Sequence, residues 1–362
     1  MPNSVLIVSR HDYRTPLQVN IHFIARALAE QFGEVNFVSV AFSAFSRRTH
    51  DDRHVLASRA NRWERWDDVN CYLWRMLWHP VSIGGPLVRR ILAPAFDLWQ
   101  RWPCEELDKV ARRADLIIIQ SGPAPALLPR LRALAPKARF IYLASDLLDA
   151  AGVHPRVQAI LDANSDCIDK VVVVARSMIP HFAGFEGRVE FIPHGLDRTA
   201  YDHETASPFT EPQNIVSIGS MLFDPSVIQI AAEAFPNARF HLIGTPEGHS
   251  YPSNVREYGP MPFAATIAYL QHADVGVAAY APAPDAGYLA DSSLKLMQFG
   301  YLGIPAVCPN FAVGERQLRF GYEPGDPQSV RVAFQQALDA KARKTSMPVL
   351  SWNEVVEKIL AP

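Results

Sequence analysis

The sequence lacks the short motifs that mark several common enzyme classes. No GxGxxG follows the first predicted strand and no GxxxxGK(S/T) occurs, which disfavours a dinucleotide-binding fingerprint and a P-loop. HExxH and GxSxG are also absent, and no DxD pair follows a predicted strand. Such a DxD pair commonly holds the divalent ion beneath a nucleotide diphosphate. We therefore expect a site that needs neither a metal ion nor a bound cofactor.

Cysteine is scarce, and no apolar run is long. Four cysteines occur, widely spaced and without a CxxC pair: Cys71, Cys104, Cys167 and Cys308. We expect reduced, buried thiols and neither a disulfide framework nor a zinc site. No apolar run reaches the roughly 18 residues that a helix needs to cross a bilayer. Residues 1–8 lack a positive stretch before their short apolar run, so we expect a first strand there and not a signal peptide.

Lysine is absent from the first 104 residues, although this part of the chain contains 13 arginines and nine acidic residues. The whole chain has 35 Lys+Arg against 37 Asp+Glu, a formal charge of −2, so a negative remainder offsets the positive N-terminal part. Six of the seven tryptophans also lie in the first 104 residues. Taken singly, each tryptophan is explained by packing in the core and each arginine by a solvated surface. Together they favour a surface for anionic lipid headgroups, since arginine pairs with phosphate and tryptophan settles at apolar–polar boundaries.

Residues 74–102 carry the densest mixture of tryptophan, aliphatic residues and arginine. We expect an amphipathic helix over residues 86–99 that Pro94 interrupts. Its periodicity fits a helix packed on a sheet as well as a helix at a membrane surface, and the tryptophan content with the absence of lysine favours the membrane. The candidate membrane-facing residues are Trp74, Trp78, Arg89, Arg90 and Trp99.

Short β-rich runs alternate with helical patterns along the whole chain, which indicates parallel sheets covered by helices. At ~150 residues per domain, 362 residues suggest two domains. We expect an α/β fold with two doubly wound, Rossmann-like domains: residues 1–201, joined by a C-terminal helix within 346–362, and residues 202–345. Residues 202–214 are rich in Pro, Ser, Thr and acidic residues, as linkers are. Because ligands in such folds bind at the carboxyl ends of strands, we expect the domains to face each other across a deep cleft.

The expected strands are short apolar runs: residues 4–9, 35–42, 115–120, 140–144, 171–175, 189–192, 215–219, 240–244 and 275–279. The strand at 140–144 runs into Ser145 and Asp146, followed by two leucines. Desolvation beside apolar residues would raise the pKa of the Asp146 carboxyl group towards that of a useful general base. A Ser-Asp pair after a strand also commonly caps a helix, and the sequence leaves both roles open.

The first strand is followed by HDYRTP, residues 11–16, and then by Asn20 and His22. Histidine, carboxylate, guanidinium and amide groups on one strand-end loop can position a polar or anionic acceptor. An Asx turn in which Asp12 caps the next helix is the alternative. The acceptor-side candidates are His11, Asp12, Arg14, Asn20 and His22.

Residues 290–300, ADSSLKLMQFG, place Lys295 in the first turn of a helix that Asp291, Ser292 or Ser293 caps. A cation is unfavourable at the positive end of a helix unless an anion lies in front of it. We therefore expect a pyrophosphate or carboxylate there, with a solvated lysine as the alternative.

Two further strand ends in the second half of the chain carry candidate groups. The small-residue turn at Gly219 and Ser220 is expected to place backbone N–H groups at a helix start, where phosphate binds. Tyr280 follows the strand at 275–279 and could stack on a base, donate to phosphate or pack on the core.

Taken in order, these stretches resemble the GumK-type β-glucuronosyltransferases of xanthan-like exopolysaccharide assembly, glycosyltransferase family 70, which have the GT-B fold. The matching segments are HDYRTP with residues 20–23, and residues 71–75, 144–146, 194–197, 219–225, 288–295, 303–310 and 320–322. The resemblance implies an inverting, metal-independent transfer of glucuronate from UDP-glucuronic acid to a mannose hydroxyl. The implied acceptor is an oligosaccharide on a polyprenyl diphosphate. We expect peripheral attachment at the cytoplasmic face of the bacterial inner membrane, where the implied acceptor lies. The near-neutral net charge argues against a nucleic-acid partner.

The resemblance also implies roles for individual residues. Asp146 falls on the family's proposed catalytic base. Donor-binding positions fall on Met221, Met261, Tyr280, Lys295 and Gln298, with Leu294 in place of a methionine, and Gly219, Ser220, Ser292 and Ser293 adjoin them. His194 and Asp197 lie in a matching segment and are further candidates. Whether Lys295 faces the pyrophosphate or the glucuronate carboxylate stays open.

Three positions depart from the family pattern. Pro260 and His181 stand where the family has glutamates, and Leu143 stands where an arginine precedes Ala-Ser-Asp. These departures leave other functions open: a GT-B hexosyltransferase with another nucleotide sugar, or a sugar-nucleotide epimerase that turns over its donor without an acceptor. The non-enzymatic alternative is a polysaccharide- or nucleotide-binding partner in an assembly complex, which would hydrolyse no donor.

Overall fold

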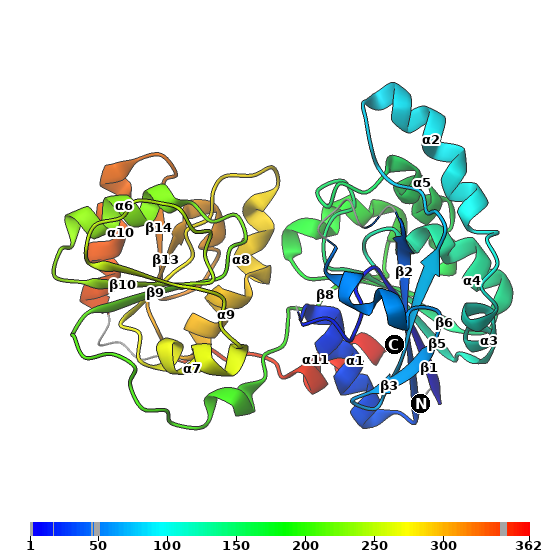
Figure 1. Ribbon diagram of the computed structural model, residues 1–362, viewed down its shortest axis with the longest axis horizontal. Helices are drawn as coiled ribbons and strands as arrows, with labels where there is room; N and C mark the ends of the chain where they lie inside the picture. Colours follow the sequence, from blue (N-terminus) through cyan, green and yellow to red (C-terminus); the bar gives the residue numbers. More distant parts are fainter. Residues whose placement is uncertain (1–2, 17, 45, 47–50, 341–345) are drawn as a thin grey trace. The chain divides into compact units, whose positions relative to one another are not determined.

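The computed structural model describes residues 3–16, 18–44, 46, 51–340 and 346–362 (Figure 1). The chain divides into two compact units: unit 1 comprises Met1–Pro193 and Trp352–Pro362, and unit 2 comprises His194–Ser351. The division at Pro193 lies before residues 202–214, whose composition suggested a linker. Each unit contains one sheet with helices packed against it.

Unit 1 contains an eight-stranded sheet in the order β3-β4-β2-β1-β5-β6-β7-β8. Neighbouring strands are parallel except β3 with β4. The strands are β1 (Ser4–Ser9), β2 (Glu34–Ser43), β3 (Trp63–Trp66), β4 (Val69–Met76), β5 (Leu116–Gln120), β6 (Arg139–Ala144), β7 (Lys170–Val173) and β8 (Val189–Phe191). Strands β1 and β5 are buried along their whole length, which is why SVLIVS and LIIIQ are nearly continuous apolar runs.

The helices of unit 1 are α1 (Asn20–Gln31), α2 (Pro86–Trp99), α3 (Glu105–Arg113), α4 (Leu128–Leu134), α5 (Pro155–Ala163) and α11 (Trp352–Leu360). Shorter 3₁₀ segments are η2 (Asp52–Arg59), η3 (Ala124–Leu127), η4 (Ser165–Cys167) and η5 (Arg176–Phe185). Helix α2 continues through Pro94, so the expected interruption is wrong. Pro94 is exposed, and the carbonyl group of Arg90 that loses its N–H partner can bind water instead.

The last helix, α11, packs on α1 within unit 1. The rings of Phe23 and Trp352 stack with their centroids 5.0 Å apart. Arg139 donates to the carbonyl oxygens of Leu360 and Ala361, at 2.5 Å each. A cation at the negative end of a helix is stabilising, so this contact holds the end of the chain against the sheet of unit 1.

Unit 2 contains a six-stranded parallel sheet in the order β11-β10-β9-β12-β13-β14. Its strands are β9 (Asn214–Ile218), β10 (Arg239–Ile243), β11 (Val255–Tyr258), β12 (Val275–Val277), β13 (Ala306–Pro309) and β14 (Arg319–Tyr322). Its helices are α6 (Pro225–Ala234), α7 (Phe263–Gln271), α8 (Leu289–Ser292), α9 (Leu294–Tyr301) and α10 (Pro327–Ala340). The 3₁₀ segments are η6 (Arg198–Tyr201), η7 (Ala286–Tyr288) and η8 (Asn310–Ala312).

Gly276 in β12 lies beneath Phe299 of α9. A Cβ atom at position 276 would lie 2.5 Å from atoms of the Phe299 ring, closer than non-bonded atoms approach. Only glycine lets α9 lie so near the sheet at this point. The contact fixes the helix whose first turn carries Lys295.

The strand order identifies where ligands bind in each unit. In unit 1, β1 lies between β2 and β5, and in unit 2, β9 lies between β10 and β12. In unit 1 the chain passes from β1 to β2 in one direction along the sheet and from β5 to β6 in the other, and in unit 2 the same holds for β9 to β10 and β12 to β13. Such a reversal opens a crevice at the carboxyl ends of the two neighbouring strands. A ligand site is therefore expected at this edge of the sheet in each unit.

The nine predicted strands are all present with small shifts at their ends. The sequence prediction missed β3, β4, β11, β13, β14 and helix α3. Four of these five strands have only four residues each and carry charged residues or proline, as in WERW, VREY, AVCP and RFGY. Such short runs do not show a two-residue alternation clearly enough to be told from loops.

Candidate functional site

Four polar side chains meet at the carboxyl edge of the unit 1 sheet, where β1, β5 and β6 end and α1 begins. Ser9 Oγ donates to Gln120 Oε1 at 2.5 Å. Gln120 Nε2 donates to Asn20 Oδ1 and to Ser145 Oγ, at 3.2 Å each. Asn20 Nδ2 donates to Ser145 Oγ at 2.8 Å. These four residues form the polar floor, which holds the backbone leading into Asp146 because every member is bonded to another.

Asp146 follows the polar floor directly. Its backbone N–H donates to Ser121 Oγ at 3.2 Å. The residue keeps access to solvent, yet protein atoms surround much of the carboxyl group and this burial raises its pKa. Helix α5 begins at Pro155 with His154 as its N-cap, so the Ser145–Asp146 pair does not cap that helix. An accessible carboxylate with a raised pKa can accept a proton from a substrate hydroxyl.

A cavity of about 370 Å³, called here the α5 cavity, adjoins Asp146. It is lined by the loop after β6, by α5 and by η5: residues 147–149, 153–155, Gln158, Asp162, His181 and Phe182. The sequence prediction did not find it, because its walls come from segments that are apart in the chain and carry no recognisable motif.

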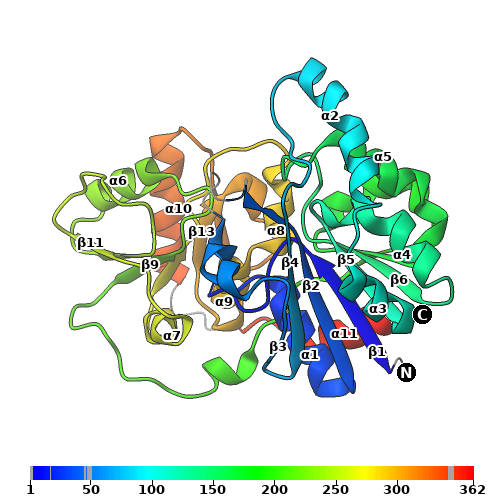
Figure 2. The same ribbon diagram turned by 45° about the vertical axis from the view of Figure 1, so that its right-hand side comes forward.

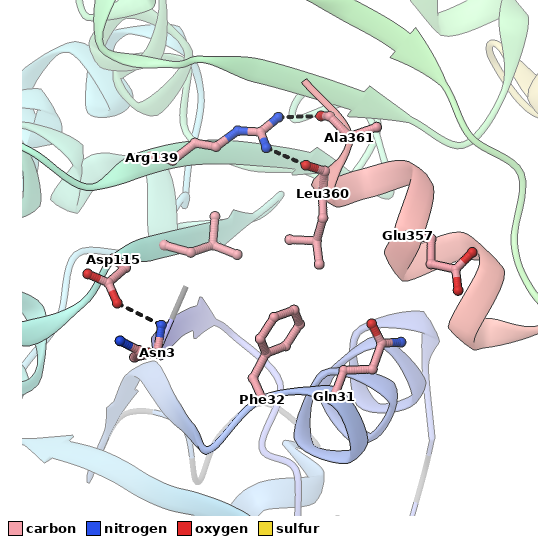
Figure 3. Close-up of a pocket in the computed structure, with 9 residues that line it drawn as sticks. Asn3, Gln31, Phe32, Asp115, Arg139, Glu357, Leu360 and Ala361 are labelled. Atoms are coloured by element: carbon pink, nitrogen blue, oxygen red, sulfur yellow. Dashed lines mark hydrogen bonds between the residues drawn. The ribbon is translucent and has the colours of Figure 1, made fainter. Parts of the chain in front are cut away.

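A second cavity, of about 680 Å³, lies at the opposite edge of the same sheet, where β1, β5 and β6 begin (Figure 3). The residues that line it include Asn3, Phe32, Asp115 and Arg139. Its two central charges are already engaged: Asp115 accepts from the Asn3 N–H at 2.8 Å, and Arg139 binds the end of α11. None of the predicted site residues lines this cavity.

Asp12 and Arg14 are buried together, which corrects their expected role towards an acceptor. Arg14 Nε and Nη2 donate to the two carboxylate oxygens of Asp12 at 2.8 Å each, and Ser39 Oγ donates to Asp12 Oδ2 at 2.7 Å. Arg14 Nη1 donates to Glu64 Oε2 at 2.5 Å. Burial raises the pKa of the Asp12 carboxyl group, but the hydrogen bonds and charge of Arg14 outweigh it and lower the pKa overall. The pair ties the loop after β1 to β2 and β3.

His22 is also buried and structural, contrary to expectation. Its Nδ1 accepts the Val19 N–H at 2.8 Å, so Nε2 carries the proton and donates to the carbonyl oxygen of Asp12 at 3.0 Å. Burial lowers the pKa of His22 to about 4. His11 is the acceptor-side candidate that stays partly exposed, and burial lowers its pKa to about 4 as well. At neutral pH His11 is therefore an uncharged polar group.

Lys295 lies at the carboxyl edge of unit 2, in the first turn of α9. Ser293 is the N-cap of this helix, and its Oγ accepts the Leu296 N–H at 3.2 Å. The ammonium group lies 4.9 Å from the centroid of the Tyr280 ring, and burial lowers its pKa to about 8. Among the described residues no carboxylate pairs with it. A partly buried cation that no carboxylate of the described residues neutralises is suited to an anionic ligand.

Tyr280 and Ser293 position Lys295: the Tyr280 ring packs against its ammonium group, and Ser293 caps the helix that carries it. Tyr280 is 1% exposed, and its hydroxyl group lies 2.6 Å from Ser293 Oγ. Ser292 is buried beside them and donates to the carbonyl oxygen of Tyr288 at 3.0 Å. All three side chains are buried and bonded within the protein, and their contacts with a donor stay predictions.

The loop after β9 is held in an unusual backbone conformation. Gly219 and Leu222 have φ angles of +85° and +49°. The Ala281 N–H donates to the carbonyl oxygen of Leu222 at 2.6 Å, and the side chain of Met221 is 50% exposed. Gly219 and Ser220 do not stand at a helix start, because α6 begins at Pro225 and the Asp224 carboxylate caps it, accepting the Ser226 N–H at 3.0 Å. A carboxylate in that position leaves no room for phosphate.

The remaining predicted residues lie around the same edge of unit 2. Met261 lies between β11 and α7, and Leu294 and Gln298 lie on successive turns of α9, all partly exposed. His194 and Asp197 precede η6. Burial lowers the pKa of His194 to about 4, whereas Asp197 is exposed and accepts from Thr199 Oγ1 at 2.7 Å.

The side chains exposed on and around α2 are not all those that the sequence predicted to face a membrane. Trp74 and Trp99 are 4% and 1% exposed, stack with ring centroids 6.3 Å apart and belong to the core. Arg89 and Arg90 are exposed, and Trp78 is partly buried. In residues 74–102 the exposed apolar side chains are Trp102 and six aliphatic ones: Leu77, Ile83, Leu87, Val88, Ile91 and Leu98. Figures 1 and 2 both show the first turns of α2 extending away from the sheet of unit 1.

The described residues contain neither a cluster of metal-ligating side chains nor a membrane-spanning helix. In residues 3–16, 18–44, 46, 51–340 and 346–362, no three His, Cys, Asp or Glu side chains are grouped as ligands of a metal ion. In the same part of the chain, no helix has both the length and the apolar character needed to span a membrane.

Known proteins resemble this chain in sequence and in fold. Residues 7–174 match the family described as "Glucuronosyltransferase GumK, N-terminal domain". The UDP-glucuronate:glycolipid 2-beta-glucuronosyltransferase of Xanthomonas campestris pv. campestris is 38% identical over 359 residues, covering 99% of this chain and 89% of that protein.

Solved structures share the fold at low sequence identity. Sucrose-phosphate synthase from Thermosynechococcus elongatus has a TM-score of 0.62 at 14% identity, covering 99% of this chain and 94% of its own. An α,α-trehalose-phosphate synthase from Burkholderia xenovorans in complex with glucose-6-phosphate also has a TM-score of 0.62, at 13% identity, with 98% and 96% covered. These similarities identify the fold alone, which is GT-B.

The buried, neutral state of His22 predicts a loss of stability in acid. Between the ordinary pKa of 6.5 and the folded pKa of about 4, the unfolded chain binds a proton that the folded chain does not. The free energy of unfolding therefore falls as the pH drops through this window, by up to about 3 kcal/mol from this group. We expect His22→Gln to flatten the pH dependence of urea unfolding between pH 6.5 and 4.5. The exposed His203→Gln variant is the control, and equal slopes for His22→Gln and the unchanged protein would contradict the prediction.

Proposed function

The chain belongs to the family of GumK glucuronosyltransferases, and from this membership we propose that it transfers glucuronate from UDP-glucuronic acid to a glycolipid. The proposed acceptor is a mannose hydroxyl of an oligosaccharide carried on a polyprenyl diphosphate. The proposed reaction inverts the anomeric centre and uses no metal ion. The observation that carries the proposal is Asp146, an accessible carboxylate with a raised pKa, held by the polar floor at the carboxyl edge of β6.

The proposed chemistry needs one base. Asp146 takes the proton of the acceptor hydroxyl as its oxygen attacks the anomeric carbon of glucuronate. The new carbon–oxygen bond forms on the face opposite the leaving group, and the bond to UDP breaks with its electron pair going to the diphosphate. Burial supports this role because it raises the pKa of the carboxyl group and so strengthens the base.

The negative charge that develops on UDP needs stabilisation. Lys295 and the N-terminus of α9 supply a cation and free backbone N–H groups in one place, which favours a diphosphate there. The glucuronate carboxylate is the other anion of the donor, and the same ammonium group suits it equally. In either position, Lys295 contributes to recognising a charged donor.

Attachment to the membrane surface is proposed from α2. This helix exposes several aliphatic side chains beside Arg89 and Arg90, the combination found on interfacial helices. The aliphatic residues would enter the boundary region of the bilayer while the arginines pair with lipid phosphates. Such peripheral attachment at the cytoplasmic face would bring the enzyme to an acceptor that is itself anchored in the lipid.

Removing the base is expected to separate catalysis from donor binding. Asp146→Asn keeps the shape of the side chain but cannot accept the proton, so we expect kcat for transfer to fall by about 10²- to 10⁴-fold. Affinity for UDP, measured by calorimetry on the full chain, should change less than twofold because the donor-binding candidates belong to unit 2. The exposed Asp166→Asn variant of unit 1 is the control. Full transfer activity in Asp146→Asn would refute the role of Asp146.

A charge on the apolar face of α2 is expected to weaken membrane binding. Ile91 is 69% exposed on α2, and Val55 is 69% exposed on η2, which makes Val55→Asp a matched control for Ile91→Asp. We expect Ile91→Asp to bind vesicles of phosphatidylethanolamine and phosphatidylglycerol more than tenfold more weakly, since a buried aliphatic side chain contributes about 2 kcal/mol. Flotation of both variants measures this. Equal loss in both, or in neither, would exclude α2 as the membrane contact.

A further inference from the structure

The lining of the α5 cavity extends from the residues that follow Asp146 to a ring that contacts helix α2. At one end, Leu147 and Leu148 line it and follow Asp146 directly in the chain. At the other end His154 lines it, and this ring also contacts α2: Nε2 donates to the carbonyl oxygen of Arg89 at 2.8 Å. Phe96 of α2 packs on the same ring, with centroids 4.6 Å apart. The cavity thus connects the proposed base with the proposed membrane helix inside one unit.

The lining of the α5 cavity combines apolar surfaces with hydrogen-bonding groups. Leu147, Val153 and Phe182 supply apolar surface, and Gln158 and Asp162 supply amide and carboxylate groups. Gln158 Nε2 donates to Asp162 Oδ1 at 2.7 Å, which leaves the amide oxygen and the second carboxylate oxygen for a ligand. This mixture suits a sugar ring, whose hydroxyl groups form hydrogen bonds while its C–H faces pack on apolar side chains.

The charges of the lining argue against an anionic ligand. Among the described residues that line the cavity there is no lysine or arginine, whereas Asp149 and Asp162 are both present. A diphosphate would meet repulsion from these carboxylates without a fixed cation to offset it. A volume of about 370 Å³ lies in the range of small-ligand pockets. An uncharged saccharide therefore fits the lining better than the phosphate part of the acceptor.

A buried hydroxyl group lies behind the same lining. The ring of Tyr142 packs on Phe182, with centroids 5.9 Å apart, and its hydroxyl group has no hydrogen-bond partner among the described residues. Burial raises the pKa of this hydroxyl, and the charges of Asp146 and Asp162 raise it further. Tyr142 is fully buried, so its ring supports the lining at Phe182 and its hydroxyl group does not itself contact a ligand.

We infer that the α5 cavity binds an uncharged sugar ring of the acceptor saccharide, next to the sugar whose hydroxyl group Asp146 deprotonates. The saccharide would extend from Asp146 through the cavity towards α2, where the lipid end of the acceptor is held. The inference rests on the proposed function and adds to it a binding site for the acceptor. Gln158 and Asp162 are its hydrogen-bonding groups.

The test compares acceptor and donor kinetics in variants of the cavity. The probe is a mannose-terminated oligosaccharide on a short-chain polyprenyl diphosphate. Gln158→Leu removes the amide, and we expect the KM for the acceptor to rise about tenfold while the KM for the donor stays within twofold. Gln335→Leu is the control, because Gln335 Nε2 donates to Asp339 Oδ1 at 2.9 Å on α10, the same pair one turn apart as Gln158 and Asp162.

A second variant fills the cavity. Val153→Trp should abolish transfer to the oligosaccharide while UDP affinity and the thermal unfolding midpoint stay near those of the unchanged protein. An unchanged acceptor KM in both variants, or a raised donor KM instead, overturns the assignment of the cavity. Absence of transfer from UDP-glucuronic acid by the unchanged protein overturns the proposed function itself, so the two failures are distinct.

Discussion

The parallel pairing of strands is the constraint on which the rest of the structure depends. In unit 1 it aligns the ends of β1, β5 and β6, so that Ser9, Gln120 and Ser145 come within hydrogen-bonding distance although more than 130 residues of chain separate the first from the last. The polar floor that results fixes the backbone at Asp146. In unit 2 the same constraint aligns the loops after β9 and β12 with the start of α9. Each candidate site is therefore a consequence of strand order, with loops supplying the chemistry.

Both candidate sites consist of an accessible group and a buried layer that supports it. Lys295 is placed by the ring of Tyr280 and by the helix cap at Ser293. The loop after β1 is placed by the buried ion pair of Asp12 and Arg14. Such buried pairs are costly to separate, because either partner alone would be an uncompensated polar group in the interior. Polar residues of this buried layer, such as Asp12 and Ser293, lie near the carboxyl ends of the strands but bind other groups of the protein.

The sequence predicted much of the fold because fully buried parallel strands are continuous apolar runs, and because Pro86 marks the start of a helix plainly. It placed Asp146 just after a strand and Lys295 in the first turn of a helix, as the structure has them, but it did not predict which neighbouring polar side chains are buried. Tryptophan in a helix is equally consistent with a membrane surface and with a core, and Trp99 turned out to be core because α2 turns that face towards the sheet. The α5 cavity was beyond sequence reasoning, since only the folded chain brings the loop after β6 against α5 and η5.

The central proposal is that this glucuronosyltransferase recognises a charged donor through Lys295, which no carboxylate of the described residues pairs with. The most direct measurement is the rate of transfer to the lipid-linked oligosaccharide from UDP-glucuronic acid and, separately, from UDP-glucose, UDP-galacturonic acid and GDP-mannose. The account predicts that kcat/KM for UDP-glucuronic acid exceeds that for UDP-glucose at least tenfold, since loss of one charged contact costs about 1.5 to 3 kcal/mol. Equal or faster transfer from UDP-glucose would contradict it.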